Sequence, residues 1–259
     1  MKIRALLQRE DVGIGEVSIA LSKDPPLAIK VLRIANSVQI GASEPKTSVQ
    51  AATSMLGLRG VASVVLRAGL IAPFEHLKDA DGFSLKDLWC HSILVGQIAE
   101  NIARACRHRG YDMMPQEYYT CGLVHDIGKI ILYDNFGDEF LHVVREKPAD
   151  VSDIQAESAA FLGLNHAEIG AMAAELWLLP RPVIDVVKFH HRPLDPGSTP
   201  EVVTVVTCAD EIADLVEAYP DGKPRDLVAK LRTVPPGCTQ EMLIKAVSLA
   251  LVLRPTIEV

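Results

Sequence analysis

The stretch Gly-Leu-Val-His-Asp-Ile-Gly-Lys, from Gly122 to Lys129, places a histidine and an aspartate next to each other inside an otherwise apolar segment. Polar side chains in such a segment need partners, because burying them unpaired costs free energy. Candidate partners lie on other apolar segments before and after this stretch. The stretch therefore predicts one buried metal centre built from several parts of the chain.

The composition is that of an ordinary globular protein with one large domain or two modest ones. The 259 residues are 49% hydrophobic and 23% charged, and only 5% are aromatic. A core of Leu, Val, Ile and Ala favours packed helices. The net charge of −7 argues against broad attachment to nucleic acid, which depends on Lys and Arg at the phosphates.

Apolar residues recur at helical spacing along almost the whole chain, and we find neither alternating strands nor a repeat of about 20–50 residues. We therefore predict an all-α protein. Short helices over residues 14–21, 27–36, 49–56 and 61–70, with a break at Gly57, form a predicted N-terminal lobe over residues 1–77. A helical bundle over residues 78–259 follows, and the polar segment from Lys78 to Ser84 is the predicted boundary.

Within the bundle, proline, glycine and capping residues separate the apolar segments. Asn165 with Glu168 three positions later resembles a capping box. We expect helices over residues 85–107, 117–133, 153–162, 165–179, 183–189, 202–218 and 239–253.

Cysteine usage and the N-terminal residues indicate the compartment. The five cysteines form no Cys-x-x-Cys pair, and most lie in apolar helical contexts that suit small buried thiols, which indicates a reducing environment. The first ten residues are charged throughout and lack the apolar run of a secretory signal. No uncharged apolar run reaches the roughly 20 residues of a membrane span. We therefore expect a cytoplasmic protein without membrane insertion.

Several histidines and one further aspartate lie on or beside apolar helix faces, where an ionised carboxylate needs a counter-charge. A lone buried histidine is more often hydrogen-bonded in a core than bound to metal, so the indication comes from the group. The candidate metal ligands are His91, His125, Asp126, His166, His190, His191 and Asp210. Imidazole and carboxylate without thiolate suit iron, manganese, nickel or zinc, and we expect one or two ions of iron or manganese.

Asp126 and Lys129 are the candidate catalytic residues. His125 and Asp126 point about 100° apart on a helix, and they can reach one ion if the helix end or a short irregularity turns both inward. With Asp126 as a bridging carboxylate, two ions could be held about 3.5–4 Å apart, the arrangement that activates water in phosphoester hydrolysis. Lys129 lies about one turn after Asp126. It could contact a phosphate oxygen or simply neutralise the Asp126 carboxylate.

This ligand set resembles the HD superfamily of metal-dependent phosphohydrolases. The pattern of that superfamily is a His, a His-Asp pair and a later Asp on an all-helical bundle. The matching residues are His91, His125, Asp126 and Asp210. By that resemblance these four residues would hold the first metal.

The remaining ligands are similar to those of the HD-GYP branch, which cleaves cyclic di-GMP: His166, His190 and His191. The resemblance implies that Asp126 bridges two metals, that Lys129 contacts phosphate, and that Asp87 stands at the place of a third-ion ligand. The chain departs from the branch after the His doublet, because it lacks the Gly-Tyr-Pro signature and has Arg192 where Glu is expected. This departure argues against cleavage of cyclic di-GMP.

The N-terminal lobe resembles the HDOD domain, the HD-related output domain of bacterial signalling proteins. The similarity lies in Asp-Pro-Pro at residues 24–26, Ala-Asn-Ser at 35–37 and Leu-Gly-Leu-Arg-Gly-Val at 56–61, and it extends over about residues 5–215. It implies a bacterial signal-transduction module with a signalling protein as partner. Many HDOD domains have lost the HD ligands, whereas this chain keeps nearly all of them.

Two functional classes stay open. In the first, the protein is an output module in which the metal or an anion is structural or sensory, and the surface between the lobes binds a partner. In the second, it is a metal-dependent phosphohydrolase or phosphodiesterase acting on a nucleotide or cyclic dinucleotide. A third, weaker interpretation is a nucleic-acid regulator, because a helical lobe can imitate a helix-turn-helix. The acidic balance and the lack of a basic recognition helix count against it.

Overall fold

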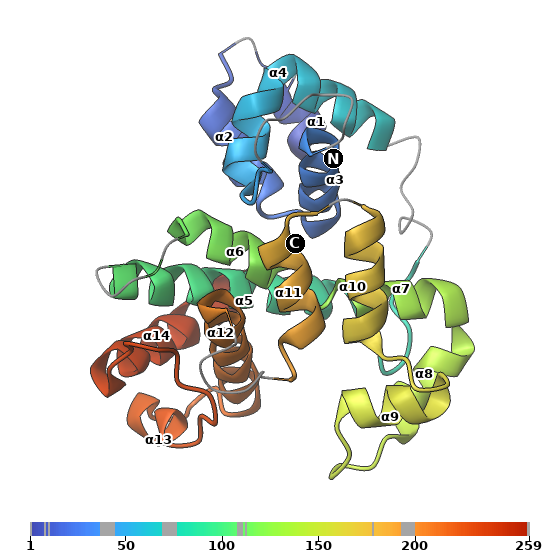
Figure 1. Ribbon diagram of the computed structural model, residues 1–259, viewed down its shortest axis with the longest axis vertical. Coiled ribbons are helices and arrows are strands. Elements are labelled where there is room, and N and C mark those ends of the chain that lie inside the picture. The colour runs from blue at the N-terminus through green and yellow to red at the C-terminus, as the bar shows by residue number, and fades with distance from the viewer. Residues whose placement is uncertain are drawn as a thin grey trace.

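The structure is a computed structural model that describes residues 2–7, 9, 11–36, 45–68, 77–107, 111, 113–177, 179–192 and 200–257. In these residues the regular secondary structure is helical, which confirms the predicted all-α fold (Figure 1). The first helices are α1 (Lys2–Leu7), α2 (Ile14–Leu21), α3 (Pro25–Ala35) and α4 (Val49–Ala68). The later helices are α5 (Leu85–Cys106), α6 (Pro115–Val124), α7 (Ile127–Phe136), α8 (Asp138–Glu146), α9 (Asp153–Ala160), α10 (His166–Leu176), α11 (Arg181–Phe189), α12 (Glu201–Ala218), α13 (Pro224–Val228), α14 (Gln240–Leu253) and the 3-10 helix η3 (Arg254–Thr256). None of the described helices combines the length and the apolar character that crossing a membrane requires.

Helices α1 to α4 pack on one another in the upper, blue to cyan part of Figure 1. Asp24 caps α3, because its carboxylate accepts from the backbone N–H of Leu27 at 3.1 Å. Pro25 takes the first helical position, where no N–H is needed. Gly57 has a φ of 65° and kinks α4, at the residue where a break was predicted. Residues 69 and 70 of the predicted helix over 61–70 lie outside the described residues.

This first group of helices joins the rest of the molecule through a continuous apolar core. Helix α6 supplies two polar contacts across the junction. The hydroxyl of Tyr119 donates to the carbonyl oxygen of Ser22 at 2.6 Å, and the backbone N–H of Val49 donates to Oγ1 of Thr120 at 3.3 Å. The boundary between residues 77 and 78 stays a prediction.

Close approaches at glycine set the spacing of the helices that carry the candidate ligands. A Cβ on Gly122 of α6 would lie 2.8 Å from Cα of Gly96 on α5. A Cβ on Gly128 of α7 would lie 1.8 Å from the backbone oxygen of His166 at the start of α10, and one on Gly170 would lie 3.1 Å from the backbone nitrogen of Gly128. Larger side chains at these positions would force the backbones apart.

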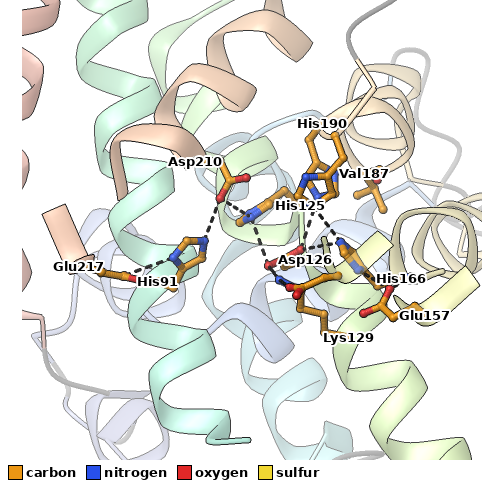
Figure 2. Close-up of polar contacts among 12 residues, drawn as sticks. His91, His125, Asp126, Lys129, Glu157, His166, Val187, His190, Asp210 and Glu217 are labelled. Atoms are coloured by element: carbon orange, nitrogen blue, oxygen red, sulfur yellow. Dashed lines mark hydrogen bonds and ion pairs between the residues drawn. The ribbon is translucent and has the colours of Figure 1, made fainter. Parts of the chain in front are cut away.

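The segment predicted as helical over residues 117–133 consists of two helices, α6 and α7, which meet at an irregularity at His125 and Asp126. Asp126 has φ −98° and ψ 15°, which is outside the helical region, so the chain turns here. Neighbours on a continuous helix point about 100° apart. The turn instead directs both side chains into the same interior region (Figure 2).

Candidate metal centre

The seven predicted ligands converge on one region, although they come from five parts of the chain. Five of them are buried, whereas His91 is partly buried and His191 is exposed. They lie on α5, in the turn between α6 and α7, at the start of α10, directly after α11, and on α12. Their potential ligand atoms form two groups, within each of which the atoms are no more than 4.8 Å apart. We call Asp126, His166, His190 and His191 the α10 group, and His91, His125 and Asp210 the α12 group.

In the α10 group, one carboxylate oxygen faces two imidazoles. Oδ1 of Asp126 is 3.3 Å from Nε2 of His166 and 3.4 Å from Nε2 of His190. Nε2 of His191 lies 3.0 Å from Nε2 of His166. Adjacent ligands of one ion with bonds of about 2.1 Å also lie roughly 3 Å apart. The spacings in this group are therefore those of atoms that could share an ion.

In the α12 group, the carboxylate belongs to Asp210. Its Oδ1 is 3.0 Å from Nε2 of His91 and 3.4 Å from Nε2 of His125 (Figure 2). Nε2 of His125 is also 3.5 Å from Oδ2 of Asp126. The two oxygens of Asp126 therefore face different groups, as a bridging carboxylate would.

Three polar atoms in this region are buried, and the structure gives them no hydrogen-bond partner among the described residues: Nε2 of His125, Oδ1 of Asp126 and Nε2 of His190. Their side chains are at most 2% exposed. Leaving a buried polar atom unsatisfied costs about 1–3 kcal/mol. Because these atoms point at a common region, a single kind of partner, a cation, would satisfy all of them.

The other ring nitrogen of these histidines fixes which atom carries the proton. Nδ1 of His125 donates to the carbonyl oxygen of Gly122 at 2.7 Å, and Nδ1 of His190 donates to the carbonyl oxygen of Val187 at 2.9 Å. A carbonyl oxygen can only accept, so Nδ1 bears a proton in both rings. Burial lowers the pKa of His190, so its ring is neutral and its Nε2 keeps a lone pair. Burial also opposes a charge on His125, but the carboxylates of Asp126 and Asp210 outweigh burial and raise its pKa. Histidines that bind a metal through one ring nitrogen usually donate a hydrogen bond from the other ring nitrogen to a carbonyl or carboxylate in this way. The residues present therefore fit a divalent cation.

Two carboxylates that sequence reasoning missed contact the ligands from outside. Glu157 on α9 is buried, and it accepts from Nδ1 of His166 at 2.7 Å and from the backbone N–H of His166 at 2.8 Å. Glu217 accepts from Nδ1 of His91 at 3.3 Å. Glu217 lies two turns after Asp210 on α12, a spacing that could have indicated it. Glu157 is distant from the HD motif in sequence, and only the fold brings it close.

The two groups differ in protonation. Burial alone would lower the pKa of His91, but hydrogen bonds to Asp210 and Glu217 outweigh burial and raise the pKa well above 6.5. For His190, burial lowers the pKa, and the nearby Asp126 carboxylate only partly offsets this. The His190 ring is therefore neutral, as a metal ligand must be, whereas the His91 ring holds a proton at neutral pH.

Lys129 is ion-paired with the same carboxylate that faces both groups. Its Nζ is 2.7 Å from Oδ2 of Asp126 and 3.6 Å from Oδ2 of Asp153 on α9. Burial opposes the charge of Lys129, but the two carboxylates outweigh it and raise its pKa. Burial likewise raises the pKa of Asp126, and Lys129 together with His125 outweighs it and holds the pKa well below its usual range. Of the two roles considered for Lys129, the structure shows the neutralisation of Asp126.

A cavity of about 380 Å³ opens beside both groups. Its apolar wall includes Phe83 and Phe140, and Lys129 lies in its polar wall. Seven acidic side chains line it but only two lysines, an imbalance that favours cations. Asp87 also lines the cavity but belongs to neither group. His91, Asp214 and Glu217 form a third set of potential ligands whose atoms are close enough to share an ion, and Asp87 is not part of this set either.

Comparisons with known proteins agree with this architecture. The family model of the HDOD domain matches residues 1–193. A protein of Treponema pallidum (strain Nichols), described as uncharacterized, is 26% identical over 219 residues, which are 81% of this chain. This chain spans only 40% of that relative's length.

Solved structures share the fold. The MmoQ response regulator of Methylococcus capsulatus (Bath) matches with a TM-score of 0.73 and 24% identity over 95% of this chain and 94% of its own. An HDOD domain protein of unknown function from Geobacter sulfurreducens matches with a TM-score of 0.56 and 24% identity, over 100% of this chain and 91% of its own. At these identities the likeness is one of fold.

Proposed function

Because this chain belongs to the HDOD family, we propose that it is a bacterial, cytoplasmic signal-transduction output module whose His/Asp centre holds one or two divalent metal ions. The observation that carries the proposal is the set of buried atoms without hydrogen-bond partners, Nε2 of His125, Oδ1 of Asp126 and Nε2 of His190. They include Oδ1 of Asp126 and Nε2 of the neutral His190 ring, two lone-pair atoms that face each other at 3.4 Å. The likeness of fold to a response regulator supports a role in signalling, with a protein as partner.

In this proposal each group would hold one ion, and Asp126 would offer one carboxylate oxygen to each group. Imidazole and carboxylate ligands suit iron or manganese. Glu157 and Glu217 orient the rings of His166 and His91 through Nδ1. The ions would supply the positive charge that the buried carboxylates of Asp126 and Asp210 require.

A second function, metal-dependent hydrolysis of a nucleotide or cyclic dinucleotide, is favoured by the cavity beside both groups. A bound divalent ion supplies Lewis acidity toward a phosphate oxygen. Lys129 is 19% exposed in the cavity wall, so its ammonium group could neutralise a phosphate oxygen there. The acidic lining means that a phosphate ester would enter only after the carboxylates are compensated by cations.

The test is the metal content of the protein purified under low oxygen and without chelator, measured by elemental mass spectrometry. We expect one or two equivalents of iron or manganese, lost in His125→Ala and kept in His142→Ala, which changes an exposed histidine of α8. Absence of metal from the folded wild-type protein would refute the proposed centre. Turnover of a phosphodiester by the loaded protein, lost in Lys129→Ala while metal is retained, would establish the second function.

A further inference from the structure

Two cysteines that are distant in sequence meet at the far end of α5. Cys106 is the last residue of α5 and is buried, and Cys238 lies in the turn before α14 and is partly exposed. Their Sγ atoms are 2.9 Å apart, which is inside the van der Waals contact distance of two sulfur atoms. Both are thiols, and a disulfide bond of about 2.05 Å would need them to approach by less than 1 Å.

A thioether and a hydroxyl lie near the two sulfurs. Sδ of Met242 lies 3.9 Å from Sγ of Cys106. The hydroxyl of Tyr111 donates to the carbonyl oxygen of Pro236 at 3.0 Å and lies 3.9 Å from Sγ of Cys238. Neither cysteine belongs to a set of atoms that could hold a metal ion among the described residues. Disulfide formation is therefore the chemistry that this pair can perform.

We propose that Cys106 and Cys238 form a reversible disulfide when the protein meets a small disulfide oxidant of the glutathione type. The Cys238 thiolate attacks one sulfur of the oxidant and releases one thiolate. The Cys106 thiolate then attacks Sγ of Cys238 and expels the second thiolate. The two expelled thiolates take up the two protons that the cysteines lose, so two protein thiols are oxidised and one small disulfide is reduced.

Access determines the order of these steps. Cys238 is the partly exposed member of the pair, so an oxidant in solution reaches it first, whereas Cys106 is fully buried and can attack only a neighbour. The bond would tie the end of α5 to the segment that leads into α14, and α14 packs on both α5 and α12. It would therefore fix the C-terminal helices on the bundle.

The disulfide would act independently of the metal centre. Cys106 follows His91 by 15 residues on α5, which corresponds to about 22 Å along the helix axis. We expect oxidation to leave the metal content unchanged. A failure of the metal proposal and a failure of the disulfide proposal are thus separate results.

The experiment treats the purified full chain with oxidised glutathione, alkylates the remaining thiols under denaturing conditions, and maps peptides by mass spectrometry with and without reduction. We expect a linked Cys106–Cys238 peptide that has lost two hydrogens, is cleaved by a reductant, and accompanies a rise in melting temperature of roughly 5–10 °C. Cys238→Ser should abolish this rise. Cys90→Ser, which removes another partly exposed thiol, should keep it.

Two results would overturn the proposal. One is alkylation of both Cys106 and Cys238 after exposure of the folded wild-type protein to the oxidant. The other is a stable mixed disulfide with glutathione at Cys238 without closure onto Cys106. Both are read on the wild-type chain, so they do not depend on the folding of a variant.

Discussion

The α10 and α12 groups lie side by side and share Asp126, yet they satisfy their buried charges differently. In the α10 group, His190 is neutral, and no donor among the described residues pairs with its Nε2 lone pair. In the α12 group, His91 is cationic and sits between the carboxylates of Asp210 and Glu217. In the metal-free protein, the proton on His91 therefore supplies part of the positive charge that a metal ion would supply. If the proposed ions bind, the His190 ring of the α10 group can accept one without losing a proton, whereas the α12 group would first have to release the proton of His91.

The largest expected effect comes from Asp126→Asn, which removes the carboxylate shared by both groups. We expect metal binding to weaken in both groups by more than the roughly 10–100-fold seen for outer partners of metal ligands. Metal content by elemental mass spectrometry, together with a competition titration, measures this loss. The matched control is Asp87→Asn, a cavity-lining carboxylate outside both groups. Retention of metal by Asp126→Asn would show that the two groups are not coupled through this residue.

The second-largest effect, that of Gly128→Ala, should be confined to the α10 group. A Cβ in Gly128→Ala would lie 1.8 Å from the backbone oxygen of His166, so α7 and α10 must separate. We expect the free energy of unfolding to fall by roughly 3 kcal/mol or more, with loss of the ion of the α10 group. Denaturant titration and metal analysis provide the measurements.

Gly15→Ala is the control for that substitution, because the space around Gly15 is open. It should leave metal binding intact and change stability by at most about 1 kcal/mol, in the stabilising direction. If Gly128→Ala behaves like Gly15→Ala, the close contact between α7 and α10 does not position His166.

The fold was predictable from local signals. For the candidate metal centre, the sequence indicated which residues take part but not how they are arranged in space. Helical periodicity and the break at Gly57 are encoded by neighbouring residues, and the structure agrees with both. The ligand types were also visible, because histidine and aspartate are conspicuous on apolar segments. A helix end or irregularity at His125 and Asp126 was foreseen as a condition for both to reach one ion, but the close packing of α6 on α5 and of α7 on α10 around it depends on residues distant in sequence.

Glu157 shows the remaining limit of sequence reasoning. It lies on a short polar helix, and its burial depends on the placement of α9 against His166. No periodicity marks such a residue, because its partner belongs to another helix. The division of the ligands into two groups likewise depends on distances between helices.

Glu157→Gln should weaken metal binding by the α10 group by about 10–100-fold, because the amide holds the His166 ring less strongly than the carboxylate does. Glu217→Gln is the corresponding change in the α12 group. The side chain of Glu217 is 37% exposed, against 3% for Glu157, so solvent screens its contact with His91. We expect a smaller effect for Glu217→Gln. Equal effects, measured by competition titration with a fluorescent chelator, would contradict the contrast between the two groups.

The smallest effect concerns pH and tests the contrast directly. The pKa values of His91 and His125 in the metal-free protein are raised above 6.5, so these rings hold protons below the raised values and release them as the pH rises through them. A metal ion must displace these protons, and the affinity of the α12 group should therefore fall about tenfold per displaced proton for each pH unit below the raised pKa values. The pKa values of His190 and His191 are lowered, so these rings need lose no proton between about pH 6 and 8. Titrations across this range should show one pH-dependent and one nearly constant binding step, and two steps with the same slope would mean that the protons on His91 and His125 do not distinguish the groups.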